Sequence, residues 1–150
     1  REMQQQGLDT SDPETYCREF HRVFTPRQMG KPEALTRTRS DPCAFPNEWP
    51  HNIAEHNRIH VPPGTWQWDW RQQMTSVQAP ALVIHAAEDL IPVDWSREWA
   101  ATLPDARLLT IPGSGHFPHL EAPDIYFSAV DQFLRGEWPE GAEAIDEKAT

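Results

Sequence analysis

The chain has 150 residues, of which 38% are hydrophobic, and it carries a formal net charge of −10. This acidic balance argues against nucleic acid and anionic membranes as partners, because both repel net negative charge. No apolar run approaches the roughly 18 residues that a membrane helix needs, and the N-terminus has no signal-like pattern, so we expect no membrane span in this chain.

Residues 1–73 interleave prolines with aromatic residues and predict a series of short helices. Asp12 can cap a helix that Pro13 opens at its first turn. The apolar face of this helix would consist of Tyr16, Phe20, Val23 and Phe24. Further short helices are expected over residues 49–60 and 65–73.

Cys17 and Cys43 are the only cysteines, and they lack the spacing of metal ligands. Two such residues favour reduced thiols in a cytoplasmic protein, although a disulfide between them stays open. A pair of histidines at helical spacing occurs among His51, His56 and His60, but no third residue has the sequence spacing expected of a further metal ligand. We therefore expect no metal site and no cofactor.

A strand, a helix and a second strand are predicted in the second half of the chain. Residues 81–84 form an apolar run that indicates a buried strand. Asp94 can cap the helix that follows, and Pro104 would stop it before a second strand over residues 107–111. The apolar face of this helix would hold Trp95, Trp99, Ala100 and Leu103. Such a unit is almost always a right-handed parallel crossover.

Asp89 and His116 follow the two predicted strands. Because parallel strands end at the same edge of a sheet, both residues should emerge where ligands of open α/β sheets bind. We therefore expect His116 to reach Asp89. Glu88 is the alternative acid.

These segments resemble the α/β-hydrolase fold in its serine-hydrolase branch. The resemblance covers residues 74–135 and rests on the acid after a strand, followed by Pro92-Val93, and on Gly115-His116-Phe117-Pro118 with Glu121 and Pro123 after it. The spacing of 27 residues (116 minus 89) also suits this family. The resemblance implies that His116 is the general base, that Asp89 fixes its tautomer, and that Asp89 rather than Glu88 is the acid.

The nucleophilic serine of this family precedes the acid on a Gly-x-Ser-x-Gly elbow. The serines before Asp89 are Ser11, Ser40 and Ser76, and none has this pattern. Ser114 lies between two glycines, but it follows the acid in a loop without the strand-to-helix turn of an elbow. We therefore expect a C-terminal fragment or subunit with an incomplete parallel sheet, which relies on the N-terminal half of the core or on a second chain for the nucleophile and the oxyanion hole.

The resemblance implies a helical lid over 1–73 and the C-terminal part of the hydrolase core over 74–136. The acidic residues and few apolar ones after these regions predict an acidic flexible tail over 137–150. The last core helix would open at Pro123 and end at Gly136. Its buried face would consist of Ile125, Val130, Phe133 and Leu134.

The function implied is hydrolysis of an ester or amide in a small molecule or peptide, in the cytoplasm. The lid is most similar to that of proline iminopeptidase-like enzymes, whose lid carboxylates hold the amino group of a peptide. The carboxylates available for this role are those of Glu14, Glu19, Glu48 and Glu55. Two alternatives stay open: a non-catalytic accessory or relic subunit, and an epoxide or haloalkane hydrolase with an Asp nucleophile.

Overall fold

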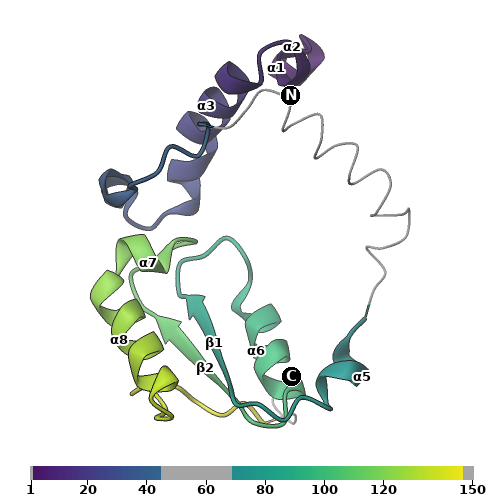
Figure 1. Ribbon diagram of the computed structural model, residues 1–150, viewed down its shortest axis with the longest axis vertical. Coiled ribbons are helices and arrows are strands. Elements are labelled where there is room, and N and C mark those ends of the chain that lie inside the picture. Colours follow the sequence, from purple (N-terminus) through teal and green to yellow (C-terminus); the bar gives the residue numbers. More distant parts are fainter. Residues whose placement is uncertain (1, 45–68, 147–150) are drawn as a thin grey trace. The chain divides into compact units, whose positions relative to one another are not determined.

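The structure, a computed structural model, describes residues 2–44 and 69–146 (Figure 1). The chain divides into two compact units. The first comprises Arg1–Pro26 and Thr38–Asp69, and the second comprises Arg27–Arg37 and Trp70–Thr150. This division differs from the boundary expected at residue 73, because Arg27–Arg37 groups with the second unit.

The first unit begins with three helices, α1 (Glu2–Gln5), α2 (Leu8–Ser11) and α3 (Pro13–Phe24). As predicted, the Asp12 carboxylate caps α3 by accepting the N–H of Thr15 at 3.2 Å, and Pro13 opens the helix. This hydrogen bonding by Thr15 holds the pKa of Asp12 below its ordinary value. The predicted helix at 49–60 lies outside the described residues, as does the part of 65–73 before residue 69.

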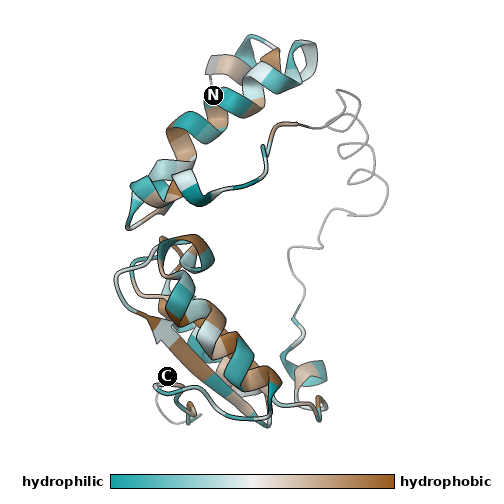
Figure 2. Ribbon diagram, turned by 60° about the vertical axis from the view of Figure 1, so that its left-hand side comes forward, coloured by the Kyte–Doolittle hydropathy of each residue, from teal (hydrophilic) through white to brown (hydrophobic). Residues whose placement is uncertain are grey.

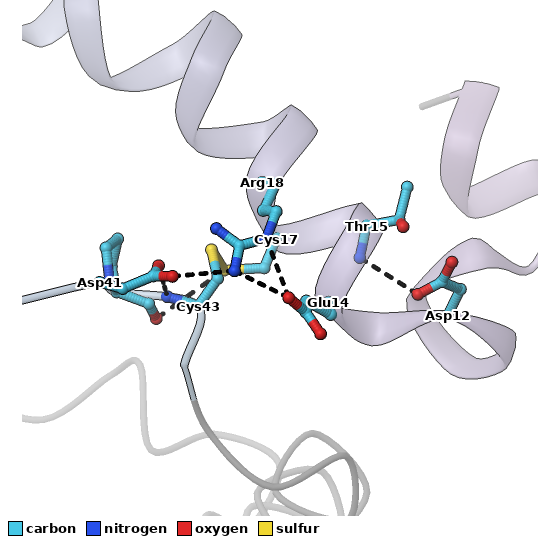
Figure 3. A network of polar contacts seen from close by, with 8 residues as sticks. Asp12, Glu14, Thr15, Cys17, Arg18, Asp41 and Cys43 are labelled. Atoms are coloured by element: carbon cyan, nitrogen blue, oxygen red, sulfur yellow. Dashed lines mark hydrogen bonds and ion pairs between the residues drawn. A yellow bond between two sulfur atoms is a disulfide. The ribbon is translucent and has the colours of Figure 1, made fainter.

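The cysteines of the first unit form a disulfide, Cys17–Cys43, which ties α3 to the segment around Cys43 (Figure 3). Beside it, the Arg18 guanidinium donates to Glu14 at 2.7 Å and to Asp41 at 2.8 Å. The expectation of reduced thiols is therefore wrong, and the pairing that the sequence left open is found. Disulfides are typical of oxidising compartments, and the cytoplasmic location stays a prediction.

The second unit is built on the strands β1 (Ala81–Ala86) and β2 (Ala106–Ile111), which pair in parallel from Ala81↔Ala106 to Ala86↔Ile111. Both strands were predicted. Its helical segments are η2 (Pro32–Arg37), α5 (Arg71–Met74), α6 (Val93–Thr102), α7 (Pro118–Glu121) and α8 (Pro123–Leu134), and the turn η1 (Thr25–Gln28) leads into it.

Helices α6 and α8 cover opposite faces of the sheet (Figure 1). On one face, Leu109 and Ile111 pack with Ala129 of α8. Side chains alternate between faces along a strand, and on the other face His85 of β1 contacts Ser96 of α6. Figure 2 shows mainly hydrophobic colour on the strand, as expected for a strand that is covered on both faces. The helix beside it shows both colours, as expected for a helix that is covered on one side.

Three details of these helices differ from the prediction. Asp94 does not cap α6: Pro92 occupies that position, and Asp94 lies in the first turn, where its charge still suits the helix dipole. Trp95 and Trp99 are 62% and 50% exposed. On α8, Ala129 is buried, whereas Ile125 and Leu134 are exposed. The end of α8 was predicted correctly, because Gly136 adopts φ 85° and closes the helix.

The expectation of a solvated tail from residue 137 is wrong for residues 138–143. Glu143 pairs with Leu108 of β2 through two backbone hydrogen bonds of 2.8 and 2.9 Å. Ala142 is buried in the core, and the Trp138 ring lies 4.8 Å from the Arg107 guanidinium. In this segment Glu140 and Glu143 are exposed, whereas Pro139 and Ala142 are buried. Among the described residues, every helix is too short or too polar to cross a lipid bilayer.

Candidate active site

The two loops at the C-terminal edge of the sheet are joined by backbone hydrogen bonds. The Ala87 amide donates to the Ile111 carbonyl, and the Glu88 amide donates to the Ser114 carbonyl, each at 2.9 Å. The turn after β1 is closed by the Asp89 amide, which donates to the Ala86 carbonyl at 3.1 Å. These bonds hold the acid loop beside the loop that carries His116.

The side chains of Asp89 and His116 meet, as the parallel crossover led us to expect. His116 Nδ1 lies 3.1 and 3.0 Å from the two carboxylate oxygens of Asp89. The Asp89 side chain is 10% exposed and the imidazole 35%. Since the carboxylate faces Nδ1, that nitrogen carries the proton of the neutral ring, and Nε2 keeps its lone pair. An imidazole in this state can accept a proton from a hydroxyl group.

The backbone around His116 is held by a second set of contacts. The His116 amide donates to the Gln28 carbonyl at 2.8 Å. The neighbouring amides of Gly115 and Phe117 donate to the Glu121 carboxylate at 3.1 and 3.3 Å. The sequence pattern included Glu121 only as part of the resemblance, and nothing in it indicated the contribution of Gln28.

Gly115 lies where a side chain has no room. A Cβ at this position would collide with the backbone of Gln28, Met29 and Gly30. The glycine in the Gly-His pattern therefore permits a close approach of two backbones, which brings residues 28–30 against the loop that carries His116.

The structure also places the other residues that the sequence offered for the site. Ser114 is fully buried, and its hydroxyl donates to the Gly115 carbonyl at 3.4 Å, so it is closed to a substrate. The imidazole of His116 contacts the carboxylate of Asp89, the acid that we had preferred to Glu88. His85 is buried and hydrogen bonded to Ser96 at 2.9 Å, the structural role that we had considered.

Of the four glutamates expected to bind an amino group, two lie in the part of the chain that the structure describes. Glu14 and Glu19 form ion pairs with Arg18 and Arg22 on α3. Hydrogen bonding from Arg22 lowers the pKa of Glu19. Glu48 and Glu55 lie outside the described residues, as do the histidines of the candidate metal pair, His51, His56 and His60.

One group in the described residues could offer three metal-binding atoms. Cys17, His21 and Cys43 place their ligand atoms within 4.8 Å of one another. Thiolates, not disulfide sulfurs, bind metal ions. In the disulfide-bonded form the two cysteines are therefore unable to act as such ligands.

Residues 7–129 match a family described as the alpha/beta hydrolase family. The chain belongs to this family. Its fold class was therefore predicted correctly.

Curated relatives match shorter stretches of the chain. A pimeloyl-[acyl-carrier protein] methyl ester esterase of Aromatoleum aromaticum is 38% identical over 69 residues, which cover 45% of this chain and 28% of that enzyme. A putative carbamate hydrolase of Caulobacter is 36% identical over 72 residues, which cover 47% of this chain and 27% of the relative.

A solved structure of an N-acyl homoserine lactone degrading enzyme is similar with a TM-score of 0.50 and 25% identity, covering 87% of this chain and 49% of that chain. The chain thus spans about half the length of this solved relative, and the matched stretches span less of the curated ones.

Proposed function

We propose that the intact protein is a serine hydrolase that cleaves an ester or amide bond through a Ser-His-Asp triad. His116 is the general base and Asp89 orients its imidazole. The nucleophilic serine comes from polypeptide outside this sequence, either the N-terminal half of the hydrolase core or a second chain. The observation that carries the proposal is the hydrogen bond between Asp89 and His116 at the shared edge of β1 and β2.

The proton transfers follow from the tautomer that this hydrogen bond favours. Nε2 of His116 takes the proton from the serine hydroxyl as Oγ bonds to the carbonyl carbon. The positive charge that develops on the imidazole is stabilised by the Asp89 carboxylate. The same proton then passes to the leaving oxygen or nitrogen as its bond to the carbonyl carbon breaks, and water regenerates the serine by the reverse sequence.

The substrate class is suggested by the relatives. Their names specify a methyl ester, a carbamate and a lactone. In each of these, a carbonyl carbon is bonded to a heteroatom leaving group, which is the centre that a serine attacks. We propose a small ester as the preferred substrate and a small peptide as the second candidate. The peptide has less support, because Glu14 and Glu19 are already engaged by arginines instead of being available to an amino group.

The test is labelling of the native, full-length protein with a fluorophosphonate probe. We expect the label on a serine outside these 150 residues. In a His116→Ala variant the labelling rate should fall by about 10²–10⁴-fold, the usual contribution of a general base. The control variant is His119→Ala, since His119 is exposed and contacts Phe117 and Tyr126.

The opposite results point to the alternatives. An absence of labelling, together with no hydrolysis of esters or amides under native conditions, would favour a non-catalytic relic subunit. Turnover of an epoxide or a haloalkane through an alkyl ester formed on an aspartate carboxylate, with opening of the epoxide or release of the halide, would favour the Asp-nucleophile branch of the fold.

A further inference from the structure

Glu121 is a buried carboxylate that takes no part in the proposed proton transfers. It is 3% exposed and ends the short helix α7. Burial of an ionised carboxylate is costly unless hydrogen bonds replace the lost water. Here its oxygens accept three backbone N–H groups, those of Lys31 at 2.8 Å, Gly115 at 3.1 Å and Phe117 at 3.3 Å.

Two of these donors flank His116 directly. The amide of His116 itself donates to the Gln28 carbonyl at 2.8 Å. Three consecutive amides of the loop are therefore engaged, two of them by Glu121. Rotation of the backbone that carries the imidazole would break at least one of these hydrogen bonds, so the loop has one preferred conformation.

The third donor links the same carboxylate to the segment that supports the loop. Lys31 follows Gln28 by three residues, and both lie on the stretch that packs against Gly115. The Arg37 guanidinium, farther along this segment, donates to the Leu120 carbonyl of α7 at 2.5 Å. One carboxylate thus holds both the loop and its support.

We infer that Glu121 is a positioning residue for His116, which keeps Nδ1 directed at Asp89 by fixing the backbone on both sides of the imidazole. The inference rests on the proposed function. A carboxylate suits this task because it only accepts hydrogen bonds. An amide in its place would turn one oxygen into an N–H donor that faces a backbone N–H.

The test compares Glu121→Gln with the wild type in the full-length protein. Amide hydrogen exchange of the peptide covering residues 113–119 reports on the loop without requiring activity, and we expect exchange to be about tenfold faster or more in the variant. Steady-state kinetics on an ester should show kcat lowered by about 10²-fold, the usual effect of a small misplacement, with KM nearly unchanged. Asp124→Asn, which alters an exposed carboxylate three residues away, should leave both readouts at wild-type values.

Each outcome has a defined meaning. A folded Glu121→Gln variant with wild-type exchange or wild-type kcat overturns the inference. If the wild type proves to have no hydrolase activity but the variant loses exchange protection in the loop, the proposed function fails while the restraint by Glu121 stands. If Glu121→Gln does not fold, Glu121→Asp keeps the charge with a shorter reach. Failure of both variants to fold would overturn the positioning role in favour of a purely structural one.

Discussion

Lys31 and Glu121 are 90 residues apart in the sequence, yet the amide of Lys31 donates to the carboxylate of Glu121 across 2.8 Å. This bond attaches an early segment of the chain to the loop that carries His116. The candidate site is therefore assembled from both halves of the sequence, and a change in residues 28–31 should affect it as much as a change next to the imidazole.

Replacement of Asp89 tests the orienting carboxylate. In the full-length protein, Asp89→Asn should lower kcat by about 10⁴-fold, because the amide favours the wrong imidazole tautomer while it preserves the shape of the site. Steady-state ester hydrolysis provides the measurement. Asp94→Asn on the exposed first turn of α6 serves as the matched control and should retain wild-type turnover. A loss of less than about tenfold in Asp89→Asn would assign the role to another acid.

Gly115→Ala tests the close approach of two backbones. The added methyl group would collide with residues 28–30, so we expect a loss of about 1–3 kcal/mol in the free energy of unfolding together with loss of activity. Urea denaturation and ester hydrolysis measure the two effects. Gly136→Ala is the control: its φ is 85° and no atom lies within 4 Å of the added methyl group, so it should lose stability but keep its activity. Equal activity of both variants would argue against a requirement for glycine at 115.

Reduction of the disulfide should destabilise the first unit. The bond joins residues separated by 26 positions, and closing such a loop stabilises a protein by about 3.5 kcal/mol in the chain-entropy account. Urea denaturation with and without a dithiol reductant should show this difference, with thiol alkylation and mass spectrometry to follow the bond. A double variant, Cys17→Ser with Cys43→Ser, should be insensitive to the reductant. If the wild type is equally insensitive, the two cysteines are not paired in solution.

Acidification should loosen the start of α3. The pKa of Asp12 is lowered in the folded state by its hydrogen bonds with Thr15, so its contribution is present above the unfolded pKa of about 3.9 and is lost as the pH falls through the folded value. We expect circular dichroism to show a loss of helix below about pH 4. Asp12→Asn keeps a capping oxygen without a titrating charge, and its transition should depend less on pH. Identical acid transitions in the two proteins would contradict this account.

The sheet and the Asp89–His116 contact could be predicted because they follow from local patterns. Residues 81–84 are an unbroken apolar run, and the acid follows it directly, so the crossover rule alone brings the two loops together. The helix caps at Asp12 and Gly136 are likewise decided by neighbouring residues.

The contacts of Glu121 and Gln28 could not be predicted in this way. They join backbone amides and carbonyls, which every residue carries, across long stretches of sequence. For the same reason, the burial of Ala142 was missed: its neighbours Glu140 and Glu143 suggested a solvated segment, whereas pairing with Leu108 is a backbone interaction that composition does not reveal.

The pairing of Glu143 with Leu108 also indicates at which edge of the sheet a further strand can be added. The backbone N–H and C=O of Leu108 that point away from β1 are already occupied by Glu143, so the far side of β2 is covered at this residue by its own polypeptide. Among the described residues no strand pairs with the other side of β1, so we expect an additional strand, whichever molecule supplies it, to dock along β1. A polypeptide docked there would lie beside the strand that leads into Asp89, so completion of the sheet would also complete the surroundings of the proposed active site.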